Sequence, residues 1–120
     1  MIVIEILIAG IALFHVFAFV MESVLWETPR ARRIFNTTPE TARATRVLAL
    51  NQGVYNLFLA AGLVWSLTAT DPVGYETKIF FLSCVVIAGV VAGFTVSKRV
   101  FIVQAVPALI ALALVLTSSN

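Results

Sequence analysis

Residues 2–26 read IVIEILIAGIALFHVFAFVMESVLW, an apolar run in which Glu5, His15 and Glu22 are the ionisable side chains. A helix of about 20 residues crosses the roughly 30 Å of hydrocarbon in a bilayer, so this run is long enough to span a membrane. The run lacks a basic leading segment, and we therefore expect it to be retained rather than cleaved as a signal peptide. It predicts a first transmembrane helix over about residues 2–26.

Three further apolar runs follow at about residues 47–69, 77–97 and 100–116, and the segments between them are short. We expect helices in all four runs, because lipid offers no water to backbone groups and the period-two alternation of a barrel strand is absent. The sequence therefore predicts an all-α fold, a four-helix transmembrane bundle with antiparallel up-down topology and short loops. We expect residues 1–120 to form a single integral membrane domain.

Composition supports lipid as the solvent of this chain. Apolar residues make up 61% of the 120 residues and charged residues 12%, whereas charged residues are about a quarter of a typical soluble domain. No basic stripe is interleaved with aromatics, so we do not expect nucleic acid as a partner. A single cysteine and a single histidine form no metal-ligand spacing, and we predict neither a metal site nor another cofactor.

Basic residues concentrate in two of the three loops. Five arginines lie between residues 27 and 46, and Lys98 and Arg99 form the last hairpin, whereas Lys78 is the one basic residue near the middle loop. Short loops rich in Lys and Arg remain in the cytoplasm. We therefore predict that loops 27–46 and 98–99 are cytoplasmic and that both termini lie outside, in a bacterial inner or plasma membrane. Membrane lipids are the expected partners of the arginines.

The first loop also carries a helix-start signal. In Thr38-Pro39-Glu40, a threonine suited to cap a helix is followed by a proline suited to the first helical position, and then by an acidic residue in the first turn. We expect the second helix to start near Pro39, as a polar collar ahead of the bilayer.

Polar side chains recur at one expected depth in the first, second and fourth runs. They are His15, Glu22, Asn51, Gln52, Tyr55, Asn56 and Gln104. His15 and Glu22 are seven residues apart, so they share one face of a helix about 10 Å apart along its axis. The second-helix members are spaced by three or four residues and are expected to form one polar face. We predict that His15 pairs with Tyr55 or Asn56.

Glu22 needs a partner inside the bundle, because a charged group in lipid costs at least about 2.5 kcal/mol. We predict that Glu22 pairs with Asn51 or Gln52, and an un-ionised Glu22 is the alternative. Ionisable residues within a membrane segment mark candidate functional sites. Interhelical hydrogen bonding that only holds the bundle together is the competing interpretation of the whole set.

The same residues belong to a set of motifs that covers nearly the whole chain. The set comprises His15…Glu22…Trp26, Thr28-Pro29-Arg30…Phe35, Asn51-Gln52-Gly53-Val54-Tyr55-Asn56, Leu59-Ala60-Ala61-Gly62-Leu63, Ala88-Gly89 and Gln104…Pro107-Ala108. This pattern resembles the DUF1304 family (domain of unknown function 1304), with the block at residues 51–56 as its most specific part. The resemblance implies a small four-helix membrane protein of bacteria or fungi without an established activity. It therefore supports the architecture and leaves the function open.

The leading functional hypothesis is a buried intramembrane site that binds a small lipophilic molecule with a polar end, between apolar walls and a few polar groups. The residues expected to line this site are His15, Phe19, Glu22, Trp26, Asn51, Gln52, Tyr55, Asn56 and Gln104. No catalytic residue is assigned, although Glu22 and His15 are the candidates for acid and base. The sequence leaves open whether the protein is an enzyme.

Three alternatives remain beside that hypothesis. The protein could be a membrane enzyme that acts by isomerase-like acid–base chemistry on a lipid-soluble substrate. It could be a small oligomeric transporter, although no inverted repeat is evident. It could also be a structural partner of another membrane protein. A homo-oligomer stays open in each case.

Overall fold

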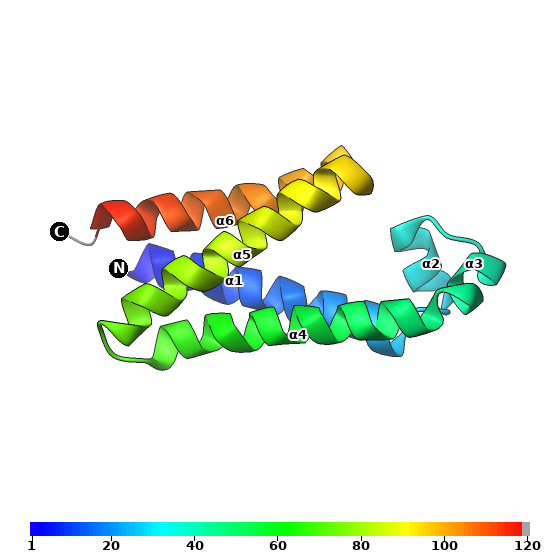
Figure 1. The fold of residues 1–120 in the computed structure, drawn as a ribbon, viewed down its shortest axis with the longest axis horizontal. Helices are drawn as coiled ribbons and strands as arrows, with labels where there is room; N and C mark the ends of the chain where they lie inside the picture. The colour runs from blue at the N-terminus through cyan, green and yellow to red at the C-terminus, as the bar shows by residue number, and fades with distance from the viewer. Residues whose placement is uncertain (119–120) are drawn as a thin grey trace. The chain divides into compact units, whose positions relative to one another are not determined.

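The computed structural model describes residues 1–118, which are all-α and contain no strand. Four helices are long and apolar enough to cross a membrane (Figure 1). These candidate spans are Ile2–Val24, Arg46–Thr68, Val73–Thr95 and Lys98–Ser118. The predicted fold class is therefore confirmed, because four long apolar helices pack against neighbours as in an up-down bundle.

The elements follow one another with little intervening chain. In order they are α1 (Ile2–Phe19), the π-helix η1 (Val20–Val24), α2 (Pro29–Phe35), α3 (Pro39–Ala44), α4 (Arg46–Thr68), α5 (Val73–Thr95) and α6 (Lys98–Ser118). Helix α5 begins four residues earlier than its apolar run, at Val73. The carboxylate of Asp71 accepts a hydrogen bond from the backbone N–H of Tyr75 (3.1 Å), which satisfies one of the free N–H groups of the first turn.

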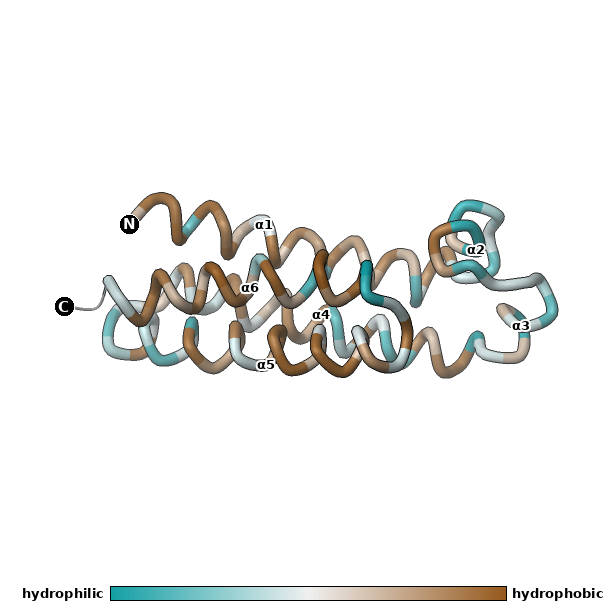
Figure 2. Tube along the Cα trace, turned by 90° about the horizontal axis from the view of Figure 1, so that it is seen from above, coloured by the Kyte–Doolittle hydropathy of each residue, from teal (hydrophilic) through white to brown (hydrophobic). Residues whose placement is uncertain are grey.

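The loop after the first span contains the two short helices, and it is the most hydrophilic part of the trace (Figure 2). Thr38 Oγ1 accepts a hydrogen bond from the backbone N–H of Thr41 (3.1 Å), and Pro39 occupies the first helical position. The predicted N-cap is therefore confirmed. The collar is nevertheless a separate helix, because α3 ends at Ala44 and α4 begins at Arg46.

The chain divides into two compact units, and the division passes through α1 and α4. One unit consists of Phe14–Phe58, and the other joins Met1–Leu13 to the chain from Leu59 onward. The expectation that residues 1–120 form a single domain stays a prediction.

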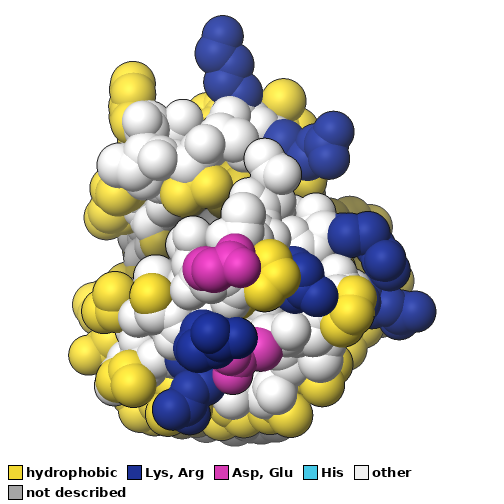
Figure 3. Space-filling model, turned by 90° about the vertical axis from the view of Figure 1, so that its right-hand side faces the viewer, with side chains coloured by type: hydrophobic (Ala, Val, Ile, Leu, Met, Phe, Trp, Pro, Cys, Tyr) yellow, Lys and Arg dark blue, Asp and Glu magenta, His cyan; other side chains and the backbone are white. Residues whose placement is uncertain are grey.

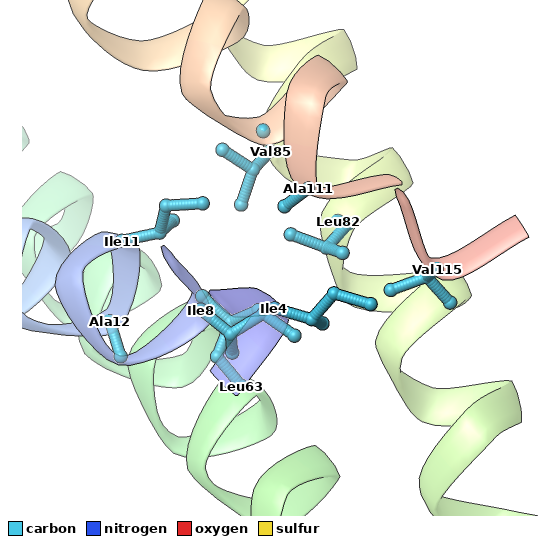
Figure 4. Close-up of a cluster of buried hydrophobic side chains, with 10 residues drawn as sticks. Ile4, Ile8, Ile11, Ala12, Leu63, Leu82, Val85, Ala111 and Val115 are labelled. Atoms are coloured by element: carbon cyan, nitrogen blue, oxygen red, sulfur yellow. The ribbon is translucent and has the colours of Figure 1, made fainter. Parts of the chain in front are cut away.

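The unit that joins Met1–Leu13 to the chain from Leu59 has a core of aliphatic side chains from α1, α4, α5 and α6 (Figure 4). Its buried members are Ile4, Ile8, Ile11, Ala12, Leu63, Leu82, Val85, Ala108, Ala111 and Val115. Helices α5 and α6 approach closely, because a Cβ added at Gly89 would lie 2.8 Å from the backbone nitrogen of Ala105. A Cβ at Gly93 would lie 2.7 Å from that of Phe101. Small residues spaced by four positions thus serve packing here.

Candidate functional site

The side chain of Asn56 on α4 connects two ionisable side chains of the first span. Its Oδ1 lies 2.8 Å from Nδ1 of His15, and its Nδ2 donates to Oε1 of Glu22 over 2.6 Å. All three residues belong to the unit Phe14–Phe58. His15 is fully buried, whereas Glu22 and Asn56 are half-buried. One carboxamide therefore holds an imidazole and a carboxyl within a single hydrogen-bonded cluster, which we call the His15–Asn56–Glu22 cluster.

Gly53 brings the two helices close enough for this cluster to form. It lies three residues before Asn56 on α4, so both residues face the same side of the helix. A Cβ at Gly53 would overlap Oγ of Ser23 and would lie 3.1 Å from the carbonyl oxygen of Phe19. Ser23 Oγ also donates to the backbone carbonyl of Leu50 (2.9 Å). These contacts fix η1 against the first half of α4.

The π-helix η1 places Glu22 in this cluster. Residues Val20–Val24 form one wide turn, which the hydrogen bond from Leu25 N–H to Val20 O closes (2.9 Å). Such single π-turns recur at functional sites. The segment ends where Trp26 Nε1 donates to Thr45 Oγ1 (3.2 Å) and where its ring packs on Phe35, with ring centroids 5.0 Å apart.

One atom of the cluster is without a partner. In the part of the chain that the structure describes, the buried side-chain nitrogen and oxygen atoms that lack a hydrogen bond are Nε2 of His15 and Oγ1 of Thr37. The ring of His15 packs edge-on against Phe14, with centroids 5.4 Å apart. Nε2 of His15 is thus buried with its hydrogen-bonding capacity unused.

A comparison with known families decides where this chain belongs. The model of the family described as protein of unknown function (DUF1304) matches residues 9–116. The chain belongs to the DUF1304 family. Searches of curated proteins and of solved structures found no match. The resemblance stated from the sequence motifs is therefore confirmed.

The structure of this DUF1304 protein confirms one predicted pairing and corrects the other. His15 pairs with Asn56, as expected. Glu22 also pairs with Asn56, and the prediction of Asn51 or Gln52 as its partner is wrong. The reason is that Asn56 has both a donor and an acceptor, so a single amide can serve two partners on neighbouring turns.

Most of the expected polar face of α4 lies at the surface of the structure, and only Asn56 at its border joins the cluster. Asn51, Gln52 and Tyr55 are exposed, and Asn51 Nδ2 donates to the carbonyl of Val47 in its own helix (2.8 Å). The buried side of this stretch is instead marked by Ala49, Gly53 and Asn56. Those spacings of four and three residues were the sequence signal that could have identified Asn56 alone as the inward amide.

The remaining predicted lining residues are distributed over both units. Phe19 is half-buried, and its carbonyl lies beside Gly53. Trp26 bonds Thr45 in the loop, at the end of η1. Gln104 is half-buried on α6 and belongs to the other unit, so its convergence with the cluster stays a prediction.

Sequence reasoning overlooked a second polar contact of this DUF1304 protein. Lys78 served only as a charge in the orientation argument. In the structure, its Nζ donates to the backbone carbonyl of Ser66 (2.8 Å), and Ser66 is fully buried. A lysine in an early turn of an apolar helix was the available signal, because such a long side chain extends toward polar atoms near the helix end.

Among residues 1–118, no three His, Cys, Asp or Glu side chains group closely enough to hold a metal ion.

Proposed function

We propose that this protein binds a lipophilic small molecule within the membrane, and that the polar end of this molecule meets the His15–Asn56–Glu22 cluster. The observation that carries the proposal is the unpartnered Nε2 of His15, whose side chain is 0% exposed. A hydrogen-bonding group supplied by a ligand would complete this site.

A purely structural role in holding the helices together accounts for only part of the cluster. Interhelical hydrogen bonds from Asn56 to His15 and Glu22 are what a purely structural role requires. They leave Nε2 unexplained, because most buried polar atoms in proteins have a partner and leaving one without a bond costs about 1–3 kcal/mol. Thr37 Oγ1 differs from Nε2, because it lies in the loop between α2 and α3 rather than on a span.

The location of the cluster supports a lipophilic ligand. His15 and Glu22 lie within the candidate span Ile2–Val24, and Asn56 lies within Arg46–Thr68. A molecule that reaches these residues from the bilayer must be largely apolar. Ligand sites of this kind combine apolar walls with few, precisely placed polar groups.

We further propose that the loop with α2 and α3 is cytoplasmic, so that the cluster lies in the inner half of the membrane. Its arginines support this orientation. Arg30, Arg33, Arg43 and Arg46 are exposed, and Figure 3 shows Lys and Arg side chains at the surface of the end that carries α2 and α3. Only Arg46 approaches an acidic side chain among the described residues, at 3.8 Å from Glu27.

Native mass spectrometry after mild detergent extraction tests the binding proposal. The wild-type protein should retain a lipophilic molecule that the Asn56→Ala variant loses. The matched control is Asn51→Ala, which removes an exposed amide from the same helix and should retain the molecule as the wild type does.

Two outcomes would contradict the proposal. The wild type could retain nothing, or both variants could retain the same molecule equally. In the second case, a lower unfolding temperature of Asn56→Ala alone would favour the structural alternative, in which the amide only joins two helices. Neither acid–base catalysis nor transport is favoured by an observation of its own in the described residues.

A further inference from the structure

The orientation of the Asn56 amide is determined by its own helix. Besides Glu22, Asn56 Nδ2 donates to the backbone carbonyl of Gln52 over 3.2 Å. A backbone carbonyl can only accept hydrogen bonds. A flipped amide would set Oδ1 against that carbonyl, so the NH₂ group must face Gln52 and Glu22. Oδ1 then faces His15, whether or not Glu22 carries a proton.

This orientation decides the tautomer of His15. The amide oxygen only accepts, so Nδ1 of His15, 2.8 Å away, must carry the ring hydrogen that it donates. In a neutral imidazole the other nitrogen then has a free lone pair. A proton on Nε2 as well would create a fully buried cation that contacts no carboxylate among residues 1–118, which is costly within a membrane. Nε2 is therefore a buried acceptor without a donor.

We propose that the polar end of the ligand is a hydroxyl group that donates its hydrogen to Nε2 of His15. This inference rests on the proposed binding function and narrows it to lipophilic molecules whose polar end carries a neutral O–H group, such as alcohols and phenols. Ethers, esters and ketones offer only acceptors, so the lone pair of Nε2 would face a lone pair of the ligand's oxygen without a hydrogen between them. An ammonium group would donate, but its desolvation costs far more than that of a hydroxyl.

The tautomer can be measured on the unmodified protein without any ligand. The chain contains one histidine, so ¹⁵N-histidine labelling gives the two nitrogen signals of His15 alone. We expect the long-range ¹H–¹⁵N spectrum in detergent micelles to show a protonated Nδ1 and an unprotonated Nε2. A hydrogen on Nε2 would overturn the inference.

A matched pair of probes tests the hydroxyl requirement. Cetyl alcohol and cetyl methyl ether share one chain, and they differ in the donor hydrogen and the methyl group that replaces it. We expect cetyl alcohol to bind the wild type about tenfold more tightly, as one hydrogen bond to a buried acceptor predicts. Cetyl alcohol should also shift the Nε2 signal, which the ether should leave in place.

The possible results distinguish a failure of this inference from a failure of the proposed function. Equal binding of both probes would leave a binding site in place and would overturn the hydroxyl requirement alone. Binding of neither probe would overturn both. As a control, Asn51→Ala should keep the tenfold preference, whereas Asn56→Ala should abolish it because the ring loses the acceptor that holds its tautomer. A preference unchanged in Asn56→Ala would overturn the role assigned to this amide.

Discussion

Gly53 and Asn56 act together at the residue scale, because they lie three positions apart on the buried side of α4. Gly53 has no side chain, so the backbone of Ser23 and the carbonyl of Phe19 can lie close to α4. At this short distance Asn56 contacts both His15 and Glu22. A hydrogen-bonded cluster needs this approach, since hydrogen bonds weaken beyond about 3.2 Å. The function of Asn56 therefore depends on the absence of a side chain one turn earlier.

The first residue-scale prediction concerns Gly53→Ala. The added methyl group would overlap Ser23 Oγ and would lie 3.0 Å from the backbone nitrogen of Ser23, so one of the two helices must shift. We expect a loss of about 1–3 kcal/mol in the free energy of unfolding. Denaturant titration in detergent micelles, followed by circular dichroism, measures it.

Gly10→Ala provides the matched control, because a Cβ added at Gly10 meets no atom within 4 Å. Alanine is the better helix former, by about 1 kcal/mol at most. This variant should be as stable as the wild type or slightly more so. If the two alanine variants were equally stable, the close approach at Gly53 would not contribute to the free energy of unfolding.

At the scale of elements, η1, α2 and α3 together form the connection between α1 and α4. Thr28 connects their parts, because its Oγ1 donates to the carbonyl of Leu25 (2.7 Å) and accepts from the N–H of Ala31 (3.3 Å). The first bond satisfies a carbonyl at the end of η1, and the second caps α2. A single side chain thus joins the end of η1 to the start of α2.

The element-scale prediction is that Thr28→Ala loosens α2. Loss of an N-cap costs about 1 kcal/mol, so we expect amide hydrogen exchange in residues 29–35 to become about fivefold faster. Mass spectrometry of exchanged peptides measures it.

Thr95→Ala is the control for this experiment. The hydroxyl of Thr95 only donates to the carbonyl of Val91 within α5 (2.8 Å), so its removal should leave exchange in α2 unchanged. Equal exchange of α2 in Thr28→Ala and in the wild type would show that the cap does not hold this helix.

At the scale of the whole molecule, four apolar spans and uneven charge determine the expected arrangement in the membrane. The loop at residues 27–46 carries five arginines, and the chain between α4 and α5 carries none. Moving several exposed arginines across a bilayer is unfavourable, which is why basic loops stay in the cytoplasm. The proposed orientation, with this loop in the cytoplasm, rests on this charge distribution.

The whole-molecule prediction is tested by cysteine labelling. Starting from Cys84→Ser, which removes the single cysteine, we expect a membrane-impermeant maleimide to label Asp71→Cys in intact cells. Glu40→Cys should react only after permeabilisation. Both positions are exposed, and the background variant without an added cysteine should stay unlabelled. The reverse pattern would place the arginine-rich loop outside and would contradict the proposed orientation.

The sequence by itself determined the all-α class, the four spans, the N-cap at Thr38 and the family. These features depend on the length of apolar runs and on contacts between residues a few positions apart. Only the tertiary structure decided which polar groups meet. Each residue turns a helix by about 100°, so Tyr55 is exposed while Asn56 beside it faces His15 and Glu22. The close approach at Gly53 involves two helices at once, and no local pattern encodes it.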